Sequence, residues 1–215
     1  MKLFGDVFDK NLWLYDLIKW TGWLPVVFDL RMKRIYVKNG KIIRHPKGFS
    51  RGKFIIIANH KSYRDPVIIM NAFFERRVTF VATKELFENR FWNFSFKHFG
   101  CVEIDKNNIS LATAKGVREK IDRGHLVALF PEGKVNRSGK TDEFKAGCVL
   151  FAKMNECPIV PVYIARRKYW YQRQKVYIGE KIPVGKMNAR DIDTIIDKIK
   201  SVEKKLIELS GGEND

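Results

Sequence analysis

Long apolar runs are missing from this sequence. Charged side chains recur even in its most hydrophobic part, the first thirty residues, so no stretch there offers the roughly 18 consecutive apolar residues of a membrane-spanning helix. Histidine is also scarce, with four copies in 215 residues. These histidines are too scattered to supply the ligand spacing of a metal site. The sequence therefore predicts neither a spanning helix nor a bound metal ion.

Acidic residues are few relative to basic ones. The chain has 24 Asp and Glu against 41 Lys and Arg, a formal net charge of +17. Such an excess indicates a polyanionic partner, either nucleic acid or the anionic face of a membrane. Residues 31–53 alone hold nine basic side chains, from Arg31 to Lys53, and no acidic one. This stretch favours contact with an anionic membrane surface, with a merely solvated basic face as the alternative.

Cysteine is rare as well, and its use indicates a compartment. The three cysteines, Cys101, Cys148 and Cys157, are an odd number in apolar surroundings, and no cleavable signal precedes them. We interpret them as reduced structural thiols in a cytosolic protein. Hydrophobic residues at 45% and charged residues at 30% are typical of a globular chain long enough to bury a substantial core.

The opening segment, residues 1–36, differs in composition from the rest. Its aromatic and aliphatic side chains share helical spacing with charges, Thr21-Gly22 indicates a break, and Pro25 suits the first turn of a second helix. We expect an amphipathic two-helix hairpin at a membrane interface, with its tryptophans at headgroup depth. Packing of this hairpin on the protein core is the alternative.

Residues 37–215 alternate short apolar runs with helical patterns, which predicts one α/β domain with a mixed, largely parallel central sheet flanked by helices. Asn39-Gly40 indicates a β-hairpin between residues 35–37 and 41–43. We expect further strands at residues 54–58, 78–82, 101–105, 125–130, 159–164 and 175–178, and helices at 66–76, 85–98, 110–123, 145–155 and 188–209.

The segment from Asn59 to Pro66 is the strongest candidate for chemistry. It places His60 at the end of a buried strand and Asp65 five residues later, as N-cap of a helix with proline in its first turn. The turn between them lets Asp65 fold back onto the imidazole, fix its tautomer and leave the other ring nitrogen free to accept a proton from a hydroxyl. A structural, hydrogen-bonded histidine is the alternative interpretation.

A second segment makes the pattern specific. The apolar run at residues 125–130 ends in Pro131-Glu132-Gly133. With Asn59-His60 and Asp65, the Phe130 to Gly133 block resembles the first and third motifs of the glycerophospholipid acyltransferase family, which includes the lysophosphatidic acid acyltransferases. Residues 100–106 and 159–162 are similar to its second and fourth motifs. The resemblance covers about residues 37 to 185 and follows the family's order.

The resemblance implies an O-acyltransferase of phospholipid biosynthesis. A fatty acyl group would pass from an acyl thioester, carried by coenzyme A or by acyl carrier protein, to the hydroxyl of lysophosphatidic acid or a related lysophospholipid. Glycerol phosphate and other amphiphiles are alternative acceptors. The thioester is a substrate, so no cofactor is expected. The enzyme would lie peripherally or monotopically on the cytoplasmic face of a membrane.

Roles for single residues follow from the motifs. His60 is the expected general base and Asp65 its orienting carboxylate. Lys84, which the resemblance brings close to the site, and backbone N–H groups of the turn at residues 61–64 are candidates for stabilising the oxyanion. The resemblance further implies a substrate-binding set, namely Asn59, Arg64, Lys106, Glu132, Gly133, Arg137 and Pro161.

The sequence departs from the family in two places. Lys106 stands where the second motif usually has arginine, which replaces a bidentate donor with a point charge. Lys134 and Val135 follow Gly133 where the third motif usually has threonine and arginine. The second departure keeps open a non-catalytic, lipid-binding family member.

A nucleic-acid-binding module is the competing interpretation. It is supported by the net charge and by the run from Arg166 to Tyr171, which interleaves cations with aromatic rings suited to lipid or to bases. That interpretation leaves the two specific motifs unexplained. We therefore expect no nucleic-acid partner.

Overall fold

The computed structural model spans residues 1–215 and describes residues 17, 29, 31–88, 96–97, 99–104, 111–131, 146–184 and 191–211. Most of the expected N-terminal hairpin lies outside this part of the chain. Leu17 and Asp29 are described, and both are helical. Among the described residues, no helix combines the length and the apolar character that crossing a membrane requires.

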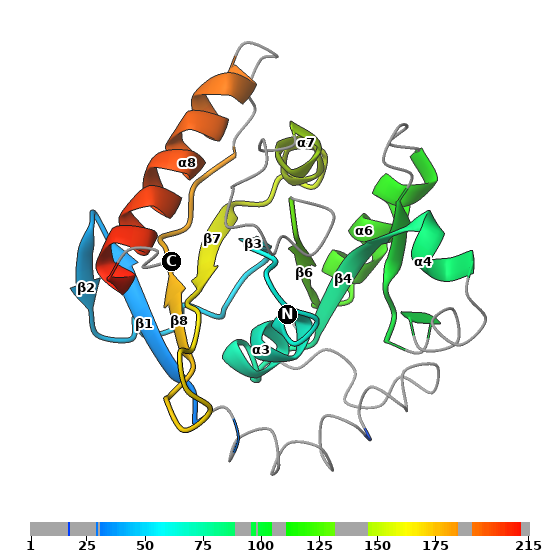
Figure 1. Ribbon diagram of the computed structural model, residues 1–215. Helices are drawn as coiled ribbons and strands as arrows, with labels where there is room; N and C mark the ends of the chain where they lie inside the picture. Colours follow the sequence, from blue (N-terminus) through cyan, green and yellow to red (C-terminus); the bar gives the residue numbers. More distant parts are fainter. Residues whose placement is uncertain are drawn as a thin grey trace.

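An eight-stranded sheet forms the centre of the molecule (Figure 1). Its strand order is β2-β1-β8-β7-β3-β6-β4-β5. The strands are β1 (Lys33–Lys38), β2 (Lys41–Ile43), β3 (Ile55–Ala58), β4 (Val78–Thr83), β5 (Val102–Ile104), β6 (Leu126–Leu129), β7 (Ile159–Ile164) and β8 (Lys175–Ile178). Strands β7, β3, β6, β4 and β5 run parallel, whereas β8 is antiparallel to β7 and β2 to β1. The predicted mixed, largely parallel sheet is confirmed.

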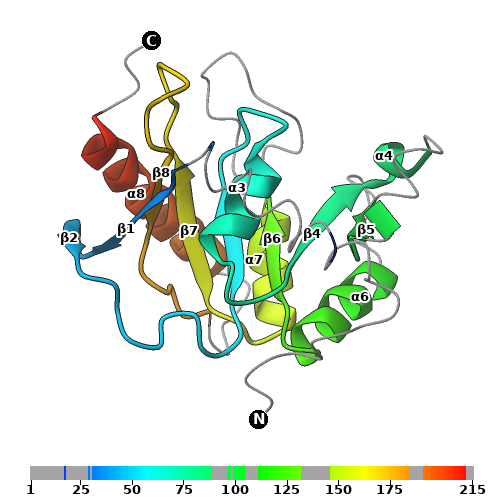
Figure 2. The same cartoon turned by 90° about the horizontal axis from the view of Figure 1, so that it is seen from below.

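Helices cover both faces of this sheet. They are α3 (Asp65–Ala72), α4 (Lys84–Glu88), α6 (Leu111–Asp122), α7 (Ala146–Met154) and α8 (Asp191–Ser210). Figures 1 and 2 show α3 on one face and α6, α7 and α8 on the other. The helices predicted at 110–123, 145–155 and 188–209 lie where expected, and the one predicted at 66–76 ends earlier, at Ala72. Of the helix predicted at 85–98, the described residues show α4 and residues 96–97, and the rest lies outside them.

The central strand β3 explains this two-sided arrangement. All four of its residues are buried. Because successive side chains of a strand point to opposite faces, Ile56 and Ala58 pack with α3, whereas Ile55 and Ile57 pack with α6, α7 and α8. Full burial of one such isoleucine contributes roughly 1.5–3 kcal/mol. A continuous apolar run is thus needed here, since both faces of the strand are covered.

The β1–β2 hairpin forms as its sequence predicts. Asn39 and Gly40 both have positive φ, +51° and +73°, the backbone conformation that an Asn-Gly hairpin turn adopts. β1 also pairs with β8, with Lys33 opposite Lys175 and Tyr36 opposite Ile178. The expected boundary after residue 36 therefore falls inside a strand of the central sheet. Residues 33–36 belong with the α/β domain.

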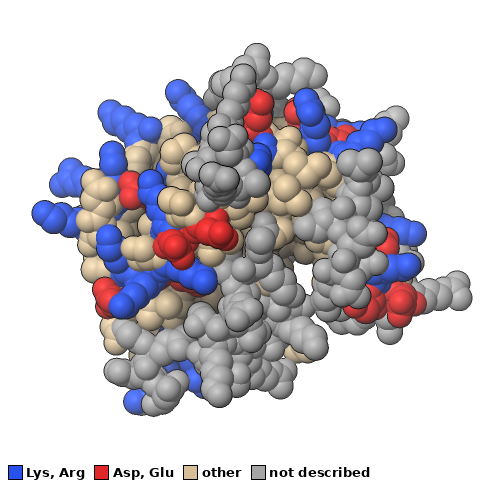
Figure 3. All heavy atoms as spheres, turned by 90° about the horizontal axis from the view of Figure 1, so that it is seen from above, with Lys and Arg blue, Asp and Glu red and all other residues tan. Residues whose placement is uncertain are grey.

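The basic stretch at residues 31–53 does not form one surface. Its first residues lie beside the start of β8. Lys53 lies at the other end of the strands, before the start of β3, and its Nζ donates to the Asn155 carbonyl at 3.0 Å. Arg34 faces α3 and pairs with Glu75 at 2.6 Å. Figure 3 shows Lys and Arg side chains around the α8 side of the molecule as well, with acidic groups among them. Positive charge is therefore spread over several faces.

Candidate active site

Three parallel strands have their carboxyl ends on the same side of the sheet and bring the motif residues to the same level. The register aligns Ile55 of β3 with Val127 of β6, and Val127 with Thr79 of β4. His60 follows β3, Phe130 follows β6 and Lys84 follows β4. Open α/β sheets bind ligands at the carboxyl ends of their strands. The expected position of His60 at such an end is confirmed.

His60 and Asp65 form the centre of the site. The Nδ1 atom of His60 lies 3.1 Å from Oδ2 of Asp65. The same oxygen accepts backbone N–H bonds from Lys61 at 2.7 Å and from Ser62 at 2.8 Å. Asp65 is only 3% exposed, so these three bonds compensate the burial of its charge. The predicted folding back of Asp65 onto the imidazole is confirmed.

Asp65 was expected to cap the following helix, and this detail is wrong. Asp65 is the first residue of α3, and Arg64 occupies the cap position without a capping hydrogen bond from its side chain. The reason is that the accepting oxygen of Asp65 points backwards, to the turn at residues 61–62 and to the imidazole. The carboxylate therefore organises the turn before the helix.

Aromatic rings hold the other side of the imidazole. Phe130 stacks on His60 with ring centroids 4.2 Å apart and an interplanar angle of 20°. Phe80 stacks in turn on Phe130, at 5.8 Å and 3°. The imidazole thus lies between a carboxylate at its edge and a phenyl ring on its face, with 16% of the side chain exposed. Both contacts restrict rotation of the ring.

This geometry sets the tautomer of His60. A carboxylate accepts hydrogen bonds but does not donate them, so Nδ1 carries the proton that Asp65 binds. The Nε2 atom then has a lone pair and can accept a proton from a hydroxyl group. When it does so, the resulting imidazolium lies beside a fixed negative charge. The pair is thus suited to general-base chemistry.

The side chain of Asn59 bonds within the protein, and its predicted contact with substrate stays a prediction. It is buried, and its Nδ2 donates to the Ile164 carbonyl at 3.2 Å while its Oδ1 accepts from the Ile164 N–H at 2.7 Å. Both polar atoms of the side chain are therefore bonded to β7. These two hydrogen bonds between side chain and backbone connect the end of β3 to the end of β7. They fix the position of the residue that precedes His60.

Arg64 is likewise engaged within the protein. Its guanidinium pairs with Oδ2 of Asp29. Arg167, in the β7–β8 loop, also contacts Asp29, donating to its carbonyl at 2.8 Å and lying 3.6 Å from its carboxylate. Asp29 thus joins the motif turn to the β7–β8 loop. The predicted substrate contact of Arg64 would require this ion pair to rearrange.

Pro161 lies within the sheet, and its contact with substrate stays a prediction. It is buried at the centre of β7, where its carbonyl accepts from the Gly179 N–H at 2.8 Å. The pairings of Val162 with Ile178 and of Ile159 with Ile182 leave one extra residue on the β8 side. This bulge lies opposite Pro161, which has no N–H for that ladder position.

The two kinds of oxyanion candidate, backbone amides of the turn and Lys84, differ in whether they are already bonded. The N–H groups of Lys61 and Ser62 bond to Asp65, and the N–H of Arg64 bonds to the Ser62 hydroxyl at 3.2 Å. These three amides therefore bond within the protein, and the expectation that amides of this turn face an oxyanion stays a prediction. Lys84 begins α4 at the correct edge of the sheet and is exposed. It stays a candidate for that role.

The ammonium of Lys61 lies near Tyr163 and interacts with the charge of Glu203 on α8. It lies 5.8 Å from the centre of the Tyr163 ring. Nearby, burial raises the pKa of the Glu203 carboxyl above its usual range, and the positive charge of Lys61 lowers it in part. Burial also raises the pKa of Tyr163, against a hydrogen bond with Ser210 that lowers it. Lys61 thus supports the packing of α8 behind the site.

The remaining predicted substrate-binding residues, Lys106, Glu132, Gly133 and Arg137, lie outside the described part of the chain. Sequence reasoning also missed two contributors to the site. The stacking of Phe130 on His60 could have been predicted, because an aromatic residue directly follows β6, the strand beside β3. Asp29 has none, since its partner Arg167 is 138 residues away in sequence.

Comparisons with known proteins agree with this geometry. A family model described as Acyltransferase matches residues 34–165. A probable 1-acyl-sn-glycerol-3-phosphate acyltransferase of Mycoplasma pneumoniae is 33% identical over 146 residues, covering 64% of this chain and 54% of that protein. The 1-acyl-sn-glycerol-3-phosphate acyltransferase of Streptococcus pneumoniae is 30% identical over 166 residues, covering 72% and 61%. The chain thus spans less than two thirds of the length of these relatives.

A solved structure has the same fold. The crystal structure of the 1-acyl-sn-glycerophosphate (LPA) acyltransferase, PlsC, from Thermotoga maritima has a TM-score of 0.61 to this chain at 20% identity, covering 94% of this chain and 83% of that one. Because the family model spans more than half of the sequence, including the segment from β3 to α3 with His60 and Asp65 and the end of β6 with Phe130, this chain belongs to the acyltransferase family.

Proposed function

We propose that this chain transfers a fatty acyl group from an acyl thioester to the free hydroxyl of 1-acylglycerol 3-phosphate or a closely related lysophospholipid, at an anionic membrane surface. The names of the relatives give the same reaction, and its product would serve phospholipid biosynthesis. The observation that carries the proposal is the hydrogen bond between Nδ1 of His60 and a carboxylate that two backbone N–H groups hold in place.

His60 is the general base of the proposed reaction. As the acceptor hydroxyl oxygen attacks the thioester carbon, its proton passes to Nε2 and a carbon–oxygen bond forms. Asp65 stabilises the imidazolium through the bond to Nδ1. Collapse of the tetrahedral intermediate breaks the carbon–sulfur bond, and the thiolate takes the proton from Nε2. No covalent acyl-enzyme is needed, because the thioester is already activated.

The negative oxygen of the intermediate needs a donor other than the turn amides that bond Asp65 and Ser62. We assign this role to Lys84, which lies after β4 at the same sheet edge. On the motif match, Glu132 and Gly133 contribute the acceptor pocket. Lys106 and Arg137 bind the acceptor phosphate through charge-assisted hydrogen bonds.

The donor and the site of action follow from chemistry and charge. The donor is the thioester of coenzyme A or of acyl carrier protein, and carrier protein is then a transient partner. The net charge of +17 supports peripheral binding to anionic lipid. We place the enzyme on the cytoplasmic face of that membrane. The N-terminal segment and the first residues of the basic stretch at 31–53 are the proposed contacts.

Acyl transfer from labelled acyl-coenzyme A to 1-acylglycerol 3-phosphate in anionic vesicles tests the proposal. We expect His60→Ala to lower turnover by roughly 100-fold to 10,000-fold, the range for loss of a general base. His45→Ala is the matched control, because His45 is exposed in the loop after β2 and we expect its removal to leave turnover within twofold.

Two outcomes would contradict the proposal. Full activity of His60→Ala would remove the assigned base. Absence of transfer from both the coenzyme A thioester and the carrier-protein thioester, to lysophosphatidic acid and to glycerol phosphate, would favour a non-catalytic, lipid-binding member of the family.

A further inference from the structure

The loop between β7 and β8, residues 165–174, presents three aromatic side chains to solvent. Trp170 is 83% exposed, Tyr171 56% and Tyr169 45%. The rings contact each other instead of the protein core: Tyr169 stacks on Tyr171 at 5.3 Å and 5°, and Trp170 packs edge-on against Tyr171 at 6.1 Å. We call these three residues the aromatic tip. Contiguous exposed aromatic surface of this kind indicates an interaction site.

Hydrogen bonds within the loop hold the aromatic tip in place. Oε1 of Gln172 accepts the backbone N–H groups of Lys168 at 2.9 Å and of Tyr169 at 3.2 Å. Arg167 points inward and donates to the carbonyl of Trp170 at 3.2 Å. At the base of the loop, Gln174 donates to the Ala165 carbonyl at 2.7 Å. A loop ordered in this way loses little conformational freedom when it binds.

Positive charge surrounds the aromatic tip. Residues 165–175 contain five basic side chains and no acidic one. Of these five, only Arg167 turns inward, whereas Arg166, Lys168, Arg173 and Lys175 are exposed. Lys168 also lies 5.5 Å from the centre of the Tyr169 ring. Tryptophan and tyrosine favour the headgroup layer of a membrane, and each nearby Lys or Arg adds attraction to anionic lipid.

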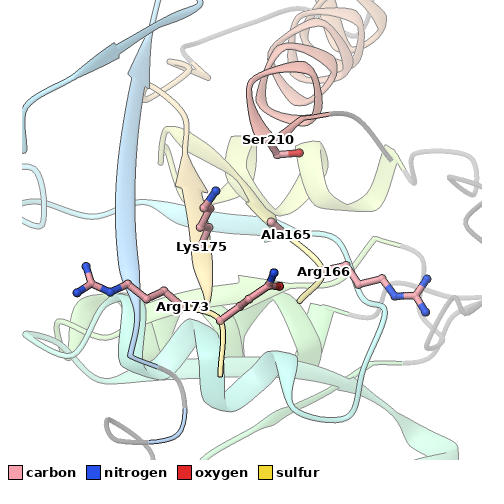
Figure 4. Close-up of a pocket in the computed structure, with 6 residues that line it drawn as sticks. Ala165, Arg166, Arg173, Lys175 and Ser210 are labelled. Carbon is pink, nitrogen blue, oxygen red and sulfur yellow. The ribbon is translucent and has the colours of Figure 1, made fainter. Parts of the chain in front are cut away.

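The arrangement of these charges favours an extended anionic surface over a single bound anion. Figure 4 shows a hollow next to the loop, of about 280 Å³ and lined also by Ala165, Gln172 and Ser210. In that view the charged ends of Arg166, Arg173 and Lys175 point in different directions and do not converge on the hollow. A phosphate needs converging donors, whereas a bilayer presents many separate headgroups. The geometry therefore matches a bilayer.

The loop is also coupled to the candidate active site. It begins directly after Ile164, whose backbone bonds the side chain of Asn59. Asp29 links Arg167 in the loop to Arg64 in the motif turn. Figure 2 shows the loop and the turn before α3 at the same end of the molecule. A surface that binds the loop is therefore brought near His60.

We propose that the aromatic tip and the exposed cations around it form a membrane-contact surface that docks the α/β domain on an anionic bilayer, with the active-site edge facing the lipid. This contact is separate from the N-terminal segment. The proposal takes one point from the proposed function, namely that the acyl acceptor is a lipid that stays in the bilayer. The binding test needs no substrate, so a chain without transfer activity still answers it.

Flotation of the full chain with vesicles of phosphatidylcholine and phosphatidylglycerol tests the proposal. Replacing all three aromatic residues of the tip by serine is expected to lower the partition coefficient at least tenfold. Ile42→Ser is the matched control, because Ile42 is 59% exposed on β2 and outside the loop. We expect this control to bind like the wild-type chain.

The charges are tested separately. The double variant Arg166→Gln with Arg173→Gln is expected to bind anionic vesicles roughly 25-fold less at low salt, from about fivefold per basic residue near the surface. The difference should shrink as salt is raised, because screening weakens the attraction. Binding of both variants to neutral vesicles is expected to be weak.

A depth measurement identifies direct contact. Lipids with brominated acyl chains quench tryptophan fluorescence, and the part of this quenching that disappears in Trp170→Phe reports on Trp170 alone. Wild-type partitioning of the aromatic-tip variant, or no change of quenching in Trp170→Phe, would overturn the proposal. So would loss of RNA binding instead of vesicle binding in the variants, since that result would assign the loop to a nucleic-acid partner.

Discussion

Replacing Asp65 with asparagine is the most informative single change, because it removes charge while keeping the shape of the side chain. In the wild-type chain one carboxylate oxygen accepts from His60 and from the N–H groups of Lys61 and Ser62. An asparagine oxygen can accept the same bonds. The imidazolium formed during the reaction would then lack its negative neighbour, so the change separates electrostatics from geometry.

The expected effects on stability and on activity differ in size. Hydrogen bonds to a charged group contribute roughly 1.5–3 kcal/mol, against about 1 kcal/mol for neutral ones. Asparagine also has no charge to desolvate, which offsets part of the loss at this buried position. We expect the free energy of unfolding to fall by about 1–3 kcal/mol, a Tm decrease of roughly 3–10 °C. Turnover should fall by about 100-fold to 10,000-fold, or roughly 3–5 kcal/mol of activation free energy.

The assay follows thiol release from the acyl thioester, with Tm measured by circular dichroism on the same samples. Asp122→Asn is the control, because Asp122 is two-thirds exposed on α6 in a surface pair with Arg118. A folded Asp65→Asn variant within threefold of wild-type turnover would refute the assigned role of the carboxylate. So would a loss of activity that is fully explained by loss of folding.

Three further changes test neighbouring features. Asn59→Ala should leave the N–H and C=O of Ile164 unsatisfied, at about 1–3 kcal/mol each, and lower Tm by roughly 5–15 °C; an unchanged Tm would argue against the structural role. Phe130→Leu should reduce kcat about twofold to tenfold by loosening His60, whereas Phe130→Tyr, which keeps the ring, should not; equal effects would exclude stacking as the cause. Glu203→Gln should raise Tm at pH 7 but not at pH 4. Burial raises the pKa of the Glu203 carboxyl in the folded chain above its value in the unfolded chain, so the folded state loses stability as pH rises above about 4.5 and the carboxyl ionises.

Local patterns predicted much of this molecule. The apolar runs correctly indicated the strands, and Asn39-Gly40 correctly indicated the hairpin, because these features depend on neighbouring residues. The approach of Asp65 to His60 was also predictable, since a five-residue turn restricts where the carboxylate can lie. Its bonding to the preceding turn was missed. An aspartate at the start of a helix can cap that helix or accept from the N–H groups of the turn before it, and the surrounding sequence does not separate the two.

Features that depend on distant pairs were not predictable. Asn59 was expected to bind substrate, yet its partner Ile164 lies 105 residues away. Arg64 was given the same role, although Asp29 engages it from 35 residues upstream. A polar residue next to a candidate catalytic histidine has no local signature that separates a substrate contact from a structural bond. The order of strands, on which both contacts depend, is likewise absent from any short pattern.

The strand order has a consequence for biosynthesis. β3 lies between β6 and β7, so a ribosome must add about a hundred residues after Ile55 before both neighbours of that strand exist. The second partner of β1, the strand β8, is synthesised later still, from Lys175. Until then the run from Phe54 to Ala58 is an apolar, uncharged segment with strong β propensity, the kind that associates with other chains. We therefore expect synthesis of this chain to depend on chaperones that protect this run, which ends two residues before His60, the proposed general base.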